Sequence, residues 1–162
     1  MNPIGVIGNV ARDRIGGKVR VGGGPFYAGK ALRALGRRGV ILTKCADDDR
    51  GRLLTPLVCL GLPVFWREAP STAGFAIEYD GEEREMTVEE LGPEWTPAEM
   101  SDWVARSLDD AEWVQVAPLS RAEFPAAALG ELGRRRRVLL DGQGLVRPAA
   151  TGRLEQIGRA HV

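Results

Sequence analysis

Three clusters of polar residues and glycines in this sequence could contact a hydroxylated ligand. They span Asn9 to Asp13, Gly22 to Tyr27, and Asp141 to Arg147, and each lies near the end of an expected strand. In an open parallel sheet, ligands bind beyond the carboxyl ends of the strands. The Asp13 carboxylate could accept hydrogen bonds from two adjacent hydroxyls, a chelate that suits a sugar or a polyol. These clusters therefore favour a small hydroxylated ligand over an apolar one.

The second cluster combines a glycine triplet with an expected helix start. Gly22–Gly24 precedes Pro25, a residue favoured at the first position of a helix. Glycines let a ligand approach the backbone closely, and a helix N-terminus directs free N–H groups toward it. Two alternatives stay open: the triplet is also typical of a plain tight turn, and Asp13 between two arginines is also compatible with a solvated loop charge.

A dinucleotide-binding site is a competing hypothesis for a chain that begins with a short buried strand. Its G-x-G-x-x-G fingerprint should follow the first strand and open a helix. Here the turn contains Gly5 and Gly8 in a spacing that does not fit, and a β segment comes next. The sequence argues against a dinucleotide-binding dehydrogenase.

The elements that position these residues alternate between strands and helices. Short apolar runs predict buried strands at 4–7, 40–42, 113–116 and 138–140. Helices are expected from Pro25, from a cap supplied by the aspartates at 47–49, and from capping boxes at Thr96–Glu99 and Ser120–Glu123. Pro56 predicts that the second helix is kinked or begins late. This order indicates one α/β domain whose parallel sheet carries helices on both faces.

A second kind of β-structure interrupts this alternation. Residues 18–21 and 73–79 alternate polar and apolar, and Asp80–Gly81 is a hairpin signal before 83–88. We predict an antiparallel lid from segments near 18–21, 63–69, 73–79 and 83–88. Its inserted segments would cover about 15–22 and 63–90, within a domain spanning 1–156.

The composition argues against nucleic acid and anionic lipid as partners. The chain has 162 residues, with 22 basic and 22 acidic side chains, so no net field attracts nucleic acid or anionic lipid. Cys45 and Cys59 form no C-x-x-C pair, and no run approaches the ~20 apolar residues of a membrane span. We expect a cytoplasmic protein that binds neither nucleic acid nor membrane.

The ordered set of motifs resembles the ribokinase-like (PfkB-type) carbohydrate kinases over most of residues 4–148. Asp13 after the first strand is followed by Gly22–Gly23, which leads into a helix that ends at Gly36. The segment 46–51 is similar to the family's G-D-D-x-x-G, and 141–147 resembles a D-x-Q-G-x-x-R ending of a subgroup that includes inositol kinases.

This resemblance implies a three-layer α/β fold with a β lid, and transfer of the ATP γ-phosphoryl to a sugar or polyol hydroxyl with Mg²⁺. It implies a homodimer through the lid. Asp13 matches the family's sugar-hydroxyl ligand, and Gly22 and Gly23 match its substrate-contacting glycines. Tyr27 replaces a frequent asparagine and puts plain ribose or fructose in doubt, although its ring could pack on the ligand. Asp141 and Arg147 are expected on the phosphate side or behind it.

The family's catalytic G-A-G-D segment does not occur in this sequence. We therefore expect the chain to be the amino-terminal, substrate-binding half of a kinase, with no catalytic residue and no metal ligand of its own. The alternative is a short, non-catalytic sugar-binding or regulatory module. Residues 157–162, which include His161, match the translation of a common sequencing adapter and are predicted to be a non-native tail.

Overall fold

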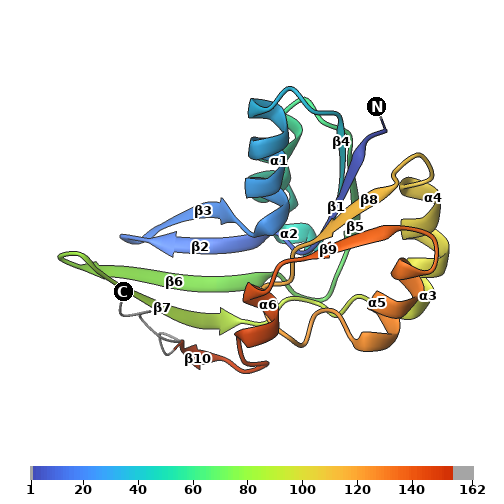
Figure 1. Ribbon diagram of the computed structural model, residues 1–162. Helices are drawn as coiled ribbons and strands as arrows, with labels where there is room; N and C mark the ends of the chain where they lie inside the picture. The colour runs from blue at the N-terminus through green and yellow to red at the C-terminus, as the bar shows by residue number, and fades with distance from the viewer. Residues whose placement is uncertain (1, 155–162) are drawn as a thin grey trace, which may run out of the picture.

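The computed structural model describes residues 2–154 and contains two sheets (Figure 1). The first sheet is parallel throughout, with the strand order β5-β4-β1-β8-β9. Its strands are β1 (Ile4–Ile7), β4 (Gly39–Cys45), β5 (Val64–Glu68), β8 (Trp113–Val116) and β9 (Arg137–Leu140). The predicted parallel sheet is confirmed.

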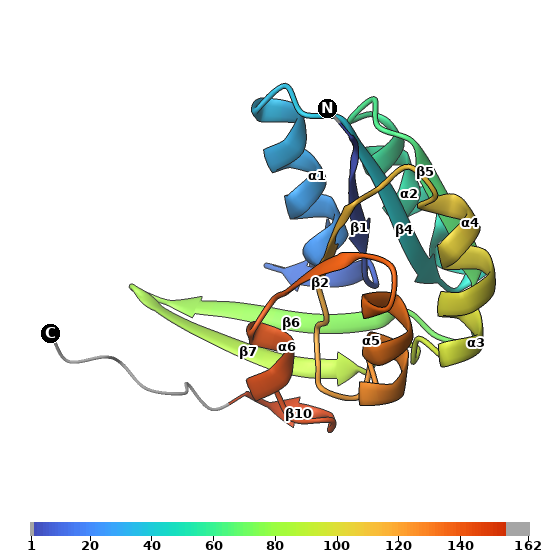
Figure 2. The ribbon, with the colours of Figure 1, turned by 45° about the vertical axis from the view of Figure 1, so that its right-hand side comes forward.

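Helices cover both faces of this sheet (Figure 2). They are α1 (Gly24–Ala34), α2 (Asp47–Val58), α3 (Pro97–Glu99), the π-helical turn η1 (Met100–Val104), α4 (Ala105–Ser107) and α5 (Ala126–Gly133). The short α6 (Gln143–Val146) follows β9 and lies beside the lid (Figure 1). Successive strand residues point to opposite faces, so Val6 packs in one cluster with Leu53 of α2. Its neighbour Ile7 packs in the other cluster with Trp103 of η1. The result is the expected three-layer arrangement.

The second sheet forms the lid, with the strand order β10-β7-β6-β2-β3. Its strands are β2 (Ala11–Ile15), β3 (Lys18–Gly22), β6 (Ala73–Asp80), β7 (Glu83–Glu90) and β10 (Gly152–Arg153). Neighbours are antiparallel except β2 and β6, which are parallel. Figure 1 shows β2, β3, β6 and β7 projecting away from the parallel sheet.

The lid differs from its prediction in two respects. The segments 18–21, 73–79 and 83–88 are lid strands as expected, and Gly81 makes the hairpin turn with φ 61°. The segment 63–69 was wrongly assigned, because β5 pairs in parallel with β4. As an edge strand of the main sheet, β5 is incompletely covered and therefore shows the mixed burial typical of a lid strand. Residues 11–15 and 152–153, in turn, form lid strands that the prediction lacked.

Of the two predicted capping boxes, only one caps a helix. Thr96 and Glu99 bond reciprocally at the start of α3, as expected. The box at 120–123 was wrong: α5 begins at Ala126, with Pro125 at the N-cap. Glu123 instead turns inward, where its Oε2 accepts a hydrogen bond from the Leu119 N–H at 2.9 Å.

The helix α2 also departs from its prediction. Its N-cap is Ala46, with no side-chain cap, so the aspartates at 47–49 occupy the first helical turn rather than the cap. Their charges still suit the positive end of the helix. The helix starts at Asp47 and continues through Pro56, so the predicted late start was wrong.

The structure also bears on a strand edge, the two cysteines, membrane-spanning helices and the tail. The strand β9 is an edge of the parallel sheet. Cys45 and Cys59 are free thiols. Among residues 2–154, no helix is both long and apolar enough to cross a membrane. The predicted non-native tail at 157–162 lies outside the described residues.

Candidate functional site

A cavity of about 390 Å³ lies between the lid and the carboxyl-terminal side of the parallel sheet. Five of the six predicted site residues line it: Asp13, Gly23, Tyr27, Asp141 and Arg147. They come from β2, the start of α1, and the segment after β9. Three stretches that are far apart in sequence thus meet at one cavity, at the edge where parallel sheets bind ligands.

The sixth residue, Gly22, lies directly against Asp13. A Cβ atom at position 22 would overlap the Asp13 carboxylate, so only glycine leaves room for that side chain. Burial raises the pKa of Asp13 to about 6, and the charges of Arg84 and Arg147 oppose this shift. Asp13 is therefore a half-buried carboxylate in the lid, and the alternative of a solvated loop charge is wrong.

Gly23 forms the N-cap of α1 with φ 91°, a conformation that strongly favours glycine. No side chain caps this helix, and its first turn contains no acidic residue. Gly23 and Gly24 both line the cavity. The backbone N–H groups at the start of α1 are thus accessible to a polar ligand. The glycine triplet therefore does more than form the plain tight turn that the sequence left open as an alternative.

Aromatic and apolar side chains complete the wall of the cavity. Tyr27 is 56% exposed, and its ring meets that of Phe26 edge to face at 5.4 Å. Phe75, Ile77 and Met86 line the cavity from the lid strands β6 and β7. A ligand in the cavity would therefore contact apolar surface beside the carboxylate, which suits the C–H faces of a ring.

Arg147 is the half-buried cation of this site. Its guanidinium lies over the Phe75 ring, 5.5 Å from the centroid. Desolvation lowers the pKa of Arg147, and the nearby charge of Arg84 acts in the same direction, whereas Asp141 and Asp13 oppose the shift. Asp141 itself accepts a hydrogen bond from the Gln143 N–H at 2.9 Å and so shapes the start of α6.

Sequence reasoning missed several residues of the cavity. Arg84 and Tyr79 reach it from the lid, Gln115 from β8, and Gln143 from the start of α6. Only Gln143 carried a signal, because it belongs to the D-x-Q-G-like segment. Tyr79 lies on β6 and Arg84 on β7, both expected lid strands, but which face of these strands meets the cavity depends on the register of the sheet.

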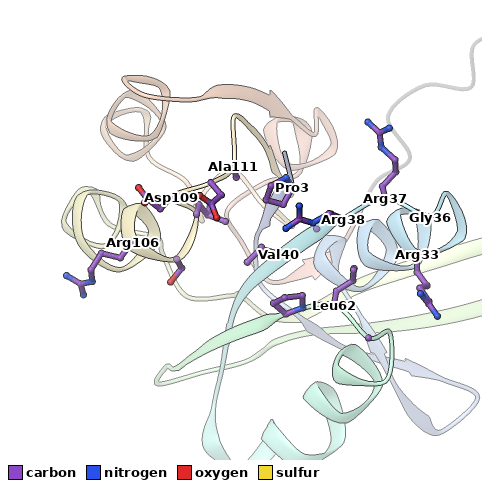
Figure 3. Close-up of a pocket in the computed structure, with 16 residues that line it drawn as sticks. Pro3, Arg33, Gly36, Arg37, Arg38, Val40, Leu62, Arg106, Asp109 and Ala111 are labelled. Carbon is purple, nitrogen blue, oxygen red and sulfur yellow. The ribbon is translucent and has the colours of Figure 1, made fainter. Parts of the chain in front are cut away.

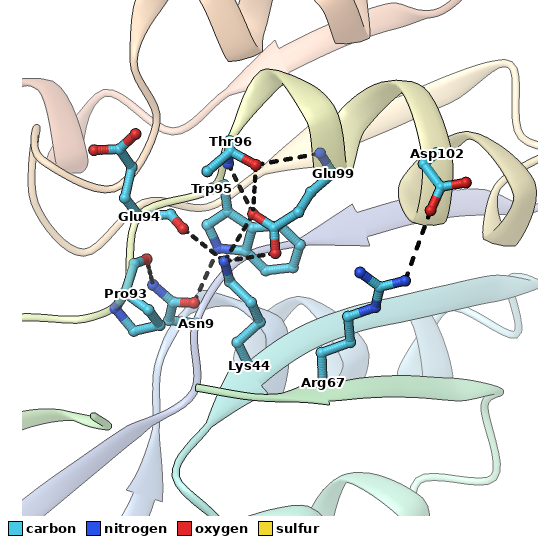
Figure 4. Close-up of polar contacts among 9 residues, drawn as sticks. All are labelled: Asn9, Lys44, Arg67, Pro93, Glu94, Trp95, Thr96, Glu99 and Asp102. Carbon is cyan, nitrogen blue, oxygen red and sulfur yellow. Dashed lines mark hydrogen bonds and ion pairs between the residues drawn. The ribbon is translucent and has the colours of Figure 1, made fainter. Parts of the chain in front are cut away.

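A polar cluster fixes the segment that returns from the lid to the main domain (Figure 4). Asn9 donates to the Pro93 carbonyl at 2.8 Å and accepts from Trp95 Nε1 at 2.9 Å. Lys44 donates to the Glu94 carbonyl at 2.6 Å and pairs with Glu99 at 3.0 Å. These bonds satisfy two buried polar side chains and tie the ends of β1 and β4 to this segment.

Glu123 lies beside this cluster, with its side chain fully buried. Desolvation raises the pKa of Glu123 to about 7, against the bond from Leu119 and the charges of Lys44 and Arg147. Its Oε1 has no hydrogen-bond partner among the described residues. Below about pH 7, the buried Glu123 carboxyl is therefore more stable protonated than ionised.

A second cavity of about 460 Å³ lies at the opposite edge of the parallel sheet, where α1 and α4 end (Figure 3). Arg33, Arg37, Arg38 and Arg106 line it. Figure 3 shows Arg33, Arg37 and Arg106 extending outward from its rim. Basic side chains at helix C-termini offset the negative end of the helix dipole. Their presence is thus explained without a ligand, and the cavity beneath the lid remains the candidate site.

The described residues 2–154 contain no group of three or more metal-ligating side chains in metal-binding positions. The cavity beneath the lid therefore offers acceptors for hydroxyl groups, a cation and open backbone, but no set of ligands for a resident metal.

The sequence and the structure were compared with those of known proteins, and the solved structures identify the fold. No protein-family model matches the sequence, and no curated protein matches it. Among solved structures, a pyrophosphate-dependent kinase of the ribokinase family, complexed with a pyrophosphate analogue and myo-inositol, aligns with a TM-score of 0.74 and 25% identity. The alignment covers 93% of this chain and 53% of that one. The chain has the ribokinase-like fold.

More distant kinases share the same fold. Phosphofructokinase-2 from Escherichia coli, in complex with fructose-6-phosphate, aligns with a TM-score of 0.58 and 15% identity over 87% of this chain and 55% of that one. Ribokinase from Arabidopsis thaliana, complexed with ribose and ATP, aligns with a TM-score of 0.57 and 14% identity. That alignment covers 86% of this chain and 53% of the ribokinase chain. The chain spans about half the length of the ribokinase-like structures it matches, which is consistent with an amino-terminal half.

Proposed function

We propose that this chain is the substrate-binding half of a kinase that transfers a phosphoryl group to a hydroxyl of a sugar or polyol. The observation that carries the proposal is the meeting of Asp13, Gly22, Tyr27 and Arg147 around one cavity beneath the lid. Asp13 would chelate two adjacent hydroxyls, while Tyr27 and Phe75 would pack on the C–H faces of the ligand. Asp141 and Arg147 would lie on the side that the phosphoryl group approaches.

The physical role of these residues is to hold and orient the acceptor. Phosphoryl transfer depends mainly on position and charge stabilisation. A carboxylate that accepts hydrogen bonds from two hydroxyls fixes the orientation of the sugar or polyol, so that one remaining hydroxyl faces the phosphoryl donor. The lid excludes water from the same space. The base and the anion-binding backbone of the family would come from sequence beyond this chain.

The donor in this proposal is ATP with Mg²⁺, as in the family that the sequence resembles. Pyrophosphate is a second candidate, because the kinase with 25% identity to this chain is described as pyrophosphate-dependent. Phosphate groups supplied by either donor carry negative charge toward the Arg147 side of the cavity. A cytoplasmic location, a homodimer through the lid, and the absence of nucleic-acid and membrane partners remain parts of the same proposal.

The test begins with the genomic locus. Resequencing should show a reading frame that continues for about 130–150 residues, the remainder of an α/β domain of usual size. The full-length protein should then phosphorylate a polyol such as myo-inositol with ATP or with pyrophosphate, measured by product formation with each donor in parallel.

Two results would contradict the proposal. A stop codon directly after Val162 in clean genomic DNA, together with polyol binding and no phosphorylation, would support the short binding module instead. Full-length protein that neither binds nor phosphorylates any of a panel of sugars and polyols would remove the kinase assignment altogether.

A further inference from the structure

Arg12 connects the lid to the main domain at the base of β2. Its guanidinium pairs with Glu90 at the end of β7 and donates to the Thr72 carbonyl, just before β6, at 3.4 Å. Its Nε lies 3.6 Å from Asp49, in the first turn of α2. One side chain on β2 thus joins β7 and the segment before β6 to a helix of the main domain.

A second contact joins the lid to α2 beside Arg12. Thr72 Oγ1 accepts a hydrogen bond from the Ala46 N–H at 2.9 Å, at the N-cap of α2. Asp49 is largely buried, with 14% of its side chain exposed. A largely buried carboxylate responds strongly to a nearby cation. Asp49, which lies within the segment similar to G-D-D-x-x-G, therefore contacts the lid from the first turn of α2.

Arg12 immediately precedes Asp13 on β2, and successive strand residues point to opposite faces. Arg12 therefore contacts the base of the lid while Asp13 faces the cavity. We propose that Arg12 is a positioning residue that, through its ion pair with Asp49, holds β2 so that Asp13 meets the ligand. This inference rests on the proposed function for its effect on substrate, but not for its effect on β2.

Arg14 provides a matched control on the same strand and face. It pairs with Glu89, to which its Nε donates at 3.1 Å, and both partners belong to the lid. Removing Arg14 deletes a lid ion pair of the same chemical type. It leaves the contacts between the lid and α2 intact.

The first experiment needs no ligand. Hydrogen exchange of the amides in 11–15 is compared in full-length protein carrying Arg12→Ala, Asp49→Asn or Arg14→Ala. Exchange should be several-fold faster with either of the first two changes and close to that of the unaltered protein with Arg14→Ala. The double variant Arg12→Ala with Asp49→Asn should exchange no faster than Arg12→Ala alone. Equal exchange in the Arg12 and Arg14 variants would overturn the proposal.

The second experiment measures phosphorylation kinetics. Arg12→Ala should raise the KM for the polyol by about three- to tenfold, the scale of a few partly exposed ion pairs, with kcat little changed. Arg14→Ala should leave both constants unchanged. A loss confined to kcat, or an equal change in both variants, would contradict a positioning role. If the unaltered protein phosphorylates no polyol, the proposed function fails, while the exchange experiment still decides the role of Arg12.

Discussion

The parallel sheet is covered by helices on both faces, whereas the lid sheet buries mainly the face that lines the cavity. In the parallel sheet, Val6 and Ile7 are both fully buried, in clusters on opposite faces. On the lid, ion pairs join Arg12 to Glu90, Arg14 to Glu89 and Arg153 to Glu85, with side chains 34–68% exposed. Exposed pairs contribute little to stability compared with apolar burial. The difference indicates that the parallel sheet with its helices, called the platform below, is more stable than the lid.

The largest expected effect is in the parallel sheet. Leu42 is fully buried in β4, so Leu42→Ala should lower the free energy of unfolding by about 2–5 kcal/mol through lost burial and a residual cavity. Met86→Ala in the lid, where the side chain is half-buried, should cost less. Urea unfolding of full-length protein measures both. An equal or larger loss for Met86→Ala would break the contrast between the two regions.

The junction between the two regions should respond to pH through Glu123. Its pKa is raised from 4.5 to about 7 by burial, so the folded protein retains a proton that the unfolded chain has lost. Stability should therefore fall as pH rises from about 4.5 to about 7, by at most about 3 kcal/mol from this group. Glu123→Gln should remove this pH dependence. The variant should therefore be more stable than the unaltered protein at pH 8, and by more than at pH 4. An unchanged pH profile of the urea midpoint would show that Glu123 is ionised without cost.

The smallest effect on stability is expected at the edge of the platform. Leu139 is 58% exposed on β9, which is an edge strand of the sheet in the described residues. In the proposed full-length kinase, a further strand would pair with this edge. Exposed apolar edges promote association, so residues 1–162 expressed alone should be poorly soluble. Leu139→Lys should increase the soluble fraction of this chain and change its melting temperature little. Equal solubility of the two forms, measured by centrifugation, would argue that β9 is not an exposed edge.

Much of the platform could be predicted because its signals are local. Continuous apolar runs mark β1, β4, β8 and β9, and the Thr96–Glu99 pair marks the start of α3. Which of the two sheets contains β5 could not be predicted in this way. An edge strand of a parallel sheet and a lid strand are both partly exposed, so their residue patterns are alike, and only pairing with β4 distinguishes them.

The candidate site was predictable where residue type limits the backbone or the charge. Gly22 and Gly23 belong to positions where a side chain would overlap Asp13 or strain the backbone. Arg84 could not be identified, because its approach to the cavity depends on the register between β6 and β7. Glu123 follows Ser120 at capping-box spacing, yet burial and the Leu119 N–H draw it inward.

The binding of a polyol to Asp13→Asn in the full-length protein tests the central claim most directly. Losing a charge-assisted chelate should weaken binding by about 1.5–3 kcal/mol, or about 10- to 150-fold, while donor affinity stays unchanged. Because the pKa of Asp13 is raised to about 6, binding to the unaltered protein should weaken as pH falls below about 6, and binding to the variant should not. Asp80→Asn, at the exposed end of β6, is the control and should bind normally. Equal polyol affinity of the Asp13 variant and the unaltered protein would contradict the account.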